Sequence, residues 1–138
     1  MTPKTFDPPR LAKPFSRYSH AAEAPGAWRW LHVSGQVGVT ADGTLLEGFE
    51  AQATQAWTNV RMVLDEAGMM PANLVKVTML LTRQEDVPAS RTTRDTALDG
   101  AKPACTLFVV AGLADPEWLI EVEAIAAAPD QAAADTSL

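Results

Sequence analysis

The spacing of hydrophobic residues changes along the chain, and these changes predict an alternation of strands and helices. Residues 28–36 (WRWLHVSGQ) are rich in aromatic and branched side chains, which favours a strand. Residues 41–43 (ADG) are typical of a turn, and residues 44–46 are expected to return as a short second strand. From residue 49 to residue 67 the apolar positions follow helical spacing, and Gly68 is expected to end that helix.

The second half of the chain predicts one more helix and three more strands. Residues 73–82 alternate between apolar and polar positions, which indicates a strand. A helix of moderate propensity is expected over residues 85–99, and strands over residues 105–111 and 118–127. The predicted fold is therefore α+β, with the order β-β-α-β-α-β-β and a mixed sheet that carries two helices on one face.

The length of 138 residues suits a single domain, with 47% hydrophobic and 20% charged residues. We expect an irregular N-terminal arm over residues 1–13, one domain over residues 14–128, and a flexible tail over residues 129–138. The first fourteen residues contain charges and prolines but no apolar stretch, so neither a signal peptide nor a membrane anchor is expected.

Charge and cysteine content narrow the possible partners. The net charge of −6 and the lack of basic clusters argue against nucleic acid as a partner. A lone cysteine, Cys105, forms no intrachain disulfide and favours a reducing, cytoplasmic location. Two separated histidines do not indicate a metal site, and no cofactor is expected.

Several side chains are candidates for chemistry. Glu121 and Glu123 share one face of the last strand, either as surface carboxylates or as a carboxylate that lines a cleft and acts as a general acid or base. Cys105 is either a small buried hydrophobe or a nucleophile with a lowered pKa. Arg91 and Arg94 share a helix face and are candidates for binding a carboxylate.

Six short motifs, in the same order along residues 14–127, resemble those of the Rid (YjgF-like) family of enamine and imine deaminases. They are YSHA at 18–21, VSGQV at 33–37, VLDEAG at 63–68, LVKVT at 74–78, KPA at 102–104 and EVEAIA at 121–126. The resemblance implies a chorismate-mutase-like fold and a homotrimer with ligand clefts between subunits. It also implies hydrolysis of 2-aminoacrylate or 2-iminopropionate without a cofactor.

The resemblance assigns a role to most of the site, but one position departs from the family pattern. Gly35 and Glu121 match the residues that contact the ligand and direct the water, and Tyr18 matches a tyrosine from the neighbouring subunit. The family's carboxylate-binding arginine is Cys105 here, followed by Thr106 in the place of the usual serine or threonine. Loss of such a charged pair costs about 2–5 kcal/mol.

Three functions follow from this departure. The first is a hydrolase or deaminase of another small imine, enamine or related metabolite, with Glu121 directing water and Arg91 supplying the missing cation. In this case the protein is not expected to be an efficient 2-aminoacrylate deaminase. The second is a small-molecule-binding protein that uses the same cleft without catalysis, and the third is a ribonuclease or translation inhibitor, which the acidic charge disfavours.

Overall fold

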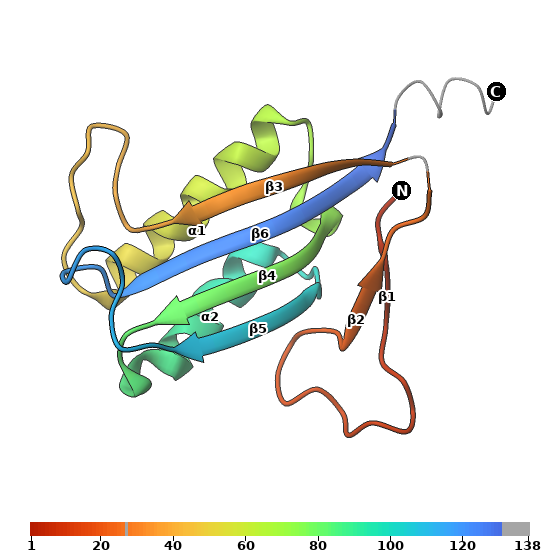
Figure 1. Cartoon of the computed structure of the whole chain (residues 1–138), viewed down its shortest axis with the longest axis horizontal. Coiled ribbons are helices and arrows are strands. Elements are labelled where there is room, and N and C mark those ends of the chain that lie inside the picture. Colours follow the sequence, from red (N-terminus) through yellow and green to blue (C-terminus); the bar gives the residue numbers. More distant parts are fainter. Residues whose placement is uncertain (27, 131–138) are drawn as a thin grey trace.

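The structure, a computed structural model, describes residues 1–26 and 28–130, and its centre is a four-stranded mixed sheet with the order β3-β6-β4-β5 (Figure 1). The strands are β3 (Trp28–Gln36), β6 (Ile120–Pro129), β4 (Leu74–Leu81) and β5 (Ala104–Val109). β6 runs antiparallel to both β3 and β4, whereas β4 and β5 are parallel. The parallel pair requires a crossover, which α2 (Val87–Leu98) provides.

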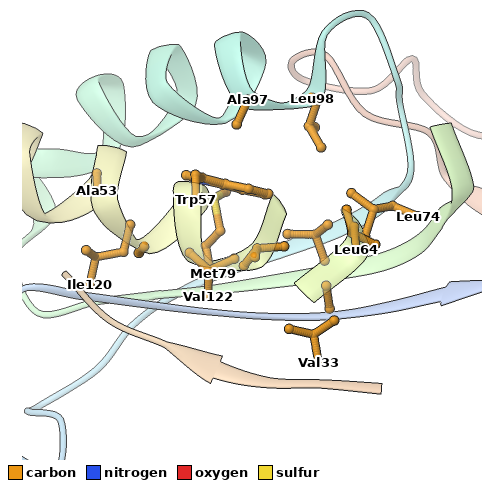
Figure 2. Close-up of a cluster of buried hydrophobic side chains, with 14 of the residues drawn as sticks. Val33, Ala53, Trp57, Leu64, Leu74, Met79, Ala97, Leu98, Ile120 and Val122 are labelled. Carbon is orange, nitrogen blue, oxygen red and sulfur yellow. The ribbon is translucent and has the colours of Figure 1, made fainter. Parts of the chain in front are cut away.

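Both helices cover the same face of the sheet, as predicted. α1 (Phe49–Glu66) packs on β6 and β3, and α2 lies beside α1 (Figure 1). Figure 2 shows Trp57 of α1 between Ala97 of α2 and the sheet residues Met79 and Val122, so this ring packs against both the second helix and the sheet. The helix ends where expected, because Gly68 adopts a positive φ of 69° that an L side chain would strain.

Two expectations about strands were wrong. Residues 44–46 form no strand and make only an isolated bridge between Val39 and Leu45, because the chain bends at Gly48 (φ 85°) into α1 immediately afterwards. Within the arm predicted to be irregular, β1 (Lys4–Phe6) pairs with β2 (Ala21–Glu23) in a separate two-stranded sheet. All three residues of β1 are exposed, so no hydrophobic alternation marked it in the sequence.

Two short 3₁₀ helices complete the fold, η1 (Pro71–Asn73) before β4 and η2 (Gln84–Asp86) before α2. The latter is fixed by Arg83, which donates to both carboxylate oxygens of the buried Asp86 at 2.8 and 3.1 Å. The predicted tail, residues 129–138, lies outside the described residues from 131 onward, and Pro129 itself belongs to β6. Along the described chain no helix is long and apolar enough to cross a membrane.

Candidate functional site

A pocket of about 290 Å³ opens at the edge of the sheet, between α2 and β5. Five of the residues named as candidates from the sequence line it: Tyr18, Arg91, Arg94, Cys105 and Thr106. The other lining residues are Phe15, Ser16 and Leu107. The lining therefore combines two guanidinium groups with hydroxyls and apolar side chains and contains no carboxylate, which makes the pocket suited to a small organic anion.

Arg94 was named from the sequence only together with Arg91, and the missing cation was assigned to Arg91. Its side chain is only 3% exposed, whereas Arg91, one turn earlier on α2, is exposed. The guanidinium is held in place because Nε donates to Oδ1 of Asp95 at 3.0 Å and Nη2 lies 3.0 Å from the same oxygen in an ion pair. Nη2 also donates to Oγ of Ser16 at 3.4 Å. Helical spacing alone showed that the two arginines share a face, but not which of them turns inward.

Cys105 lines the same pocket and is partly buried. Desolvation raises the pKa of its thiol, and the positive charge and hydrogen bonding of Arg94 lower it to a smaller extent. The balance is a raised pKa, so the neutral thiol is favoured at neutral pH. This direction weighs against the nucleophile that the sequence left open.

Glu121 and Gly35 form a second cluster, on β6 and β3. A Cβ atom added at Gly35 would lie 1.9 Å from Oε2 of Glu121, so the carboxylate rests directly on the glycine backbone. The pairing of β3 with β6 is irregular between Val33 and Gln36, which places Gly35 in this irregular stretch. The glycine is thus required for close approach and not for a positive φ.

Cys105 and Glu121 lie on opposite faces of the sheet in a single chain. Cys105 pairs with Val77 of β4, and Glu121 pairs with Leu80. Since side chains alternate along a strand, positions 77 and 80 point to opposite faces. Val77 is fully buried on the helix side, so Glu121 projects from the open face. One chain therefore does not bring Glu121 together with Cys105. Thr106 pairs with Thr78 and projects from the same face as Glu121, but β4 lies between their strands.

Tyr18 is supported by a loop that the N-terminal arm holds in place. The backbone N–H of Phe15 donates to the Tyr18 hydroxyl at 3.2 Å. His20 contacts the Tyr18 ring edge-on, and its own backbone N–H donates to Asp7 at 2.7 Å. His20 Nε2 lies 2.7 Å from the carbonyl of Ala12, so this histidine ties the loop together. In the described part of the chain, no group of three or more His, Cys, Asp or Glu residues is arranged to hold a metal ion.

Comparisons with known proteins agree with this architecture. The family described as endoribonuclease L-PSP matches residues 10–128. A RutC family protein of Aquifex aeolicus is 41% identical over 75 residues, which are 54% of this chain and 58% of that protein. The 2-iminobutanoate/2-iminopropanoate deaminase of Mus musculus is 34% identical over 111 residues, 79% of each chain.

Solved structures give the same result. The chain is similar to a Rid family protein of unknown function from Yersinia pestis, with a TM-score of 0.83 and 33% identity, over 93% of this chain and 100% of that one. It is also similar to RidA from a Psychrobacter species, with a TM-score of 0.67 and 27% identity, over 89% and 98% of the two chains. The predicted α+β Rid fold is thereby confirmed, and the chain belongs to the Rid (YjgF, L-PSP) family.

Proposed function

We propose that this protein is a hydrolase of a small imine or enamine that bears a carboxylate, and that it is active as a homotrimer with the site between subunits. The observation that carries the proposal is the division of the candidate residues into two complementary halves. One half is the cationic pocket with Tyr18, and the other is the Glu121 carboxylate on Gly35. Each half lacks what the other supplies.

Under this proposal, a second copy of the same chain completes the site. A cationic pocket can bind and orient an anion, but it holds no carboxylate to take a proton from water. Glu121 is half-buried on the open face, where β6 is flanked by apolar and aromatic side chains such as Trp30 and Ile125. Such an uncovered apolar face is typical of a subunit interface. Light scattering at micromolar concentration should give a trimer mass, and a monomer mass would contradict the shared site.

The proposed chemistry is addition of water to a C=N bond. The water oxygen attacks the imine carbon while Glu121 accepts a proton from that water. The same carboxyl group then gives the proton to the nitrogen, which leaves in the next step. The carbinolamine then collapses to a keto acid and ammonia, so that one water is consumed and no redox change occurs. Proton transfer by a positioned carboxylate contributes about 10²–10⁴-fold to such a rate. Cys105 needs no role as a nucleophile in this sequence, which agrees with its raised pKa.

The test is hydrolysis of 2-imino acids produced in situ by an amino-acid oxidase, with semicarbazide competing for the imine. We expect the wild-type protein to accelerate keto-acid release and Glu121→Gln to lose about 10²-fold or more of that activity. Glu123→Gln is the matched control, because Glu123 lies two residues along the same strand and is exposed. Equal losses in both variants would contradict the role of Glu121.

The same assay separates the enzyme from the other candidates. A protein that binds keto acids but leaves the imine lifetime unchanged over a series of side chains would be a binding protein and not a hydrolase. The ribonuclease activity named in the family description is disfavoured by the net charge of −6, because a polyanion is repelled by an acidic protein.

A further inference from the structure

Among the described residues Arg94 is the one arginine or lysine that is buried, and its N–H donors are not all taken by oxygen acceptors. Its side chain is 3% exposed. Of its five N–H groups, those on Nε and Nη2 serve Asp95 and Ser16. Within residues 1–26 and 28–130 no oxygen accepts from Nη1, and the further partner of the guanidinium is the Cys105 thiol, a weak acceptor that a ligand oxygen can replace.

The surroundings of this guanidinium also favour an anion. It lines the 290 Å³ pocket, whose lining residues include a second arginine, Arg91, and no acid. Asp95, whose side chain is 31% exposed, forms the ion pair with Arg94 but does not line the pocket. A charge of low exposure is less screened by water than a surface charge, so an anion that enters the pocket interacts with Arg94 more strongly than with Arg91.

We infer that Arg94 is the residue that binds the substrate carboxylate, reaching the pocket from α2. This inference rests on the proposed function and identifies the cation on which its specificity depends. The sequence favoured Arg91 for this role, but Arg91 is exposed and no ion pair within the described residues fixes it. Arg94 is already held in one orientation by Asp95, which lowers the entropic cost of binding.

The position of Cys105 follows from the same arrangement. Its thiol lies close enough to Arg94 for the guanidinium to act on it. An arginine at position 105 would bring a second guanidinium into the same space, and two such cations repel each other at short range. A small neutral side chain at position 105 therefore leaves room for the cation supplied by the helix.

The pocket also limits the class of substrate. Phe15, Tyr18 and Leu107 provide apolar surface beside the two guanidiniums. A volume of about 290 Å³ exceeds what a three-carbon imino acid fills. The arrangement fits a 2-imino acid whose side chain is larger than a methyl group, with its carboxylate on Arg94 and its side chain on the apolar wall.

The first experiment measures binding of pyruvate and 2-oxo-4-methylpentanoate by NMR titration, with methyl pyruvate as an uncharged control. Arg94→Gln should weaken binding of both acids by about 30-fold or more and leave methyl pyruvate unaffected. Arg94→Lys should give an intermediate loss, because lysine keeps the charge but not the planar fork. Arg61→Gln, an exposed arginine on α1 outside the pocket, controls for the change in net charge.

A second comparison starts from Cys105→Arg, which leaves Arg94 in place, so this step does not depend on the folding of an Arg94 variant. If the site had merely lost its arginine, Cys105→Arg would tighten acid binding by tenfold or more. If Arg94 supplies the cation, Cys105→Arg should bring no gain. The double variant Arg94→Gln/Cys105→Arg should regain most of the affinity that Arg94→Gln loses.

The outcomes separate this inference from the proposed function. Acid binding that is unchanged in Arg94→Gln but lost in Arg91→Gln would overturn the role of Arg94, as would a tenfold gain in Cys105→Arg. If imine turnover persists in Arg94→Gln with unchanged KM, the proposed hydrolase stands and the inference fails. If binding depends on Arg94 but no imine is hydrolysed, the anion site stands and the hydrolase fails.

Discussion

The two halves of the candidate site differ in how each is held by the fold. The pocket half is complete within one chain, because α2, β5 and the loop at Tyr18 enclose Arg94 and its partner Asp95 supports it. The Glu121 half lies on the open face of the sheet and depends on one glycine for its position. Under the proposed function, binding of the anion therefore depends on one subunit, whereas catalysis depends on assembly of two.

This difference predicts recovery of activity when two inactive variants are mixed. Arg94→Gln disables the pocket half, and Glu121→Gln disables the carboxylate half. After co-refolding at equal amounts, sites that pair an intact pocket from one chain with an intact Glu121 from another should restore about a quarter of wild-type turnover.

The measurement is imine hydrolysis by the mixture compared with each variant alone. A mixture as inactive as its components, although mass analysis shows mixed trimers, would contradict a site divided between subunits. Glu123→Gln mixed with Arg94→Gln serves as the control, because Glu123 is outside both halves.

A smaller but still large effect is expected from Gly35→Ala. The added Cβ would lie 1.9 Å from Oε2 and 2.6 Å from Cδ of Glu121, so the carboxylate must move by an ångström or more. A displacement of this size costs about 10²-fold in turnover. Affinity for a keto acid should change less, since the pocket half is untouched.

Gly112→Ala is the matched control, because an added Cβ there meets no atom within 4 Å. The comparison of kcat with keto-acid affinity decides the outcome. If Gly35→Ala loses affinity and turnover in equal proportion, the two halves are not as separate as the strand pairing indicates.

The third prediction concerns the support of the pocket half. Asp95→Asn removes the charge that holds Arg94, with Nε and Nη2 both 3.0 Å from its Oδ1. We expect a loss of about 1.5–3 kcal/mol in the free energy of unfolding, the usual worth of hydrogen bonds to a charged group. Since Asp95 is partly exposed, the lower end of this range is expected.

Urea denaturation gives the free energy, and a keto-acid titration gives the second readout. Affinity should not fall as far as in Arg94→Gln, because the guanidinium remains in the pocket. Thr96→Ala on the same helix is the control, since Thr96 is exposed and bonds only to the carbonyl of Thr92. Equal destabilisation in both variants would show that α2 is merely sensitive to substitution.

Much of the fold was predictable because it depends on periodic burial. The ends of β3 and α1 follow from residues 28–36 and from the helical spacing that Gly68 closes. β1 was not predictable, because its pairing with β2 leaves all three of its residues exposed. The bridge at Leu45 was mistaken for a strand because a turn sequence alone does not show how far a hairpin extends.

The site was predictable by residue type but not by arrangement. The resemblance named Gly35 and Glu121 separately, and their close contact across neighbouring strands was found only in the structure. The choice between Arg91 and Arg94 depends on the rotation of α2 about its axis. The apolar content and the helix propensity of residues 85–99 are both too low to predict that rotation. Which arginine is buried could therefore be seen only in the packed structure.

The smallest effect expected is at Cys105, and it reports directly on the charges of the pocket half. Burial raises the pKa of the thiol, and the thiolate is the form that reacts with iodoacetamide. A raised pKa leaves less thiolate at pH 7.5, so alkylation of the folded protein should be slower than that of free cysteine and should rise with pH.

Arg94 lowers this pKa and Asp95 raises it. Arg94→Gln should therefore move the pH profile of alkylation upward and Asp95→Asn should move it downward, with the unfolded chain in urea as the reference. Shifts in the same direction in both variants would mean that access to Cys105, and not the guanidinium beside it, controls its reactivity.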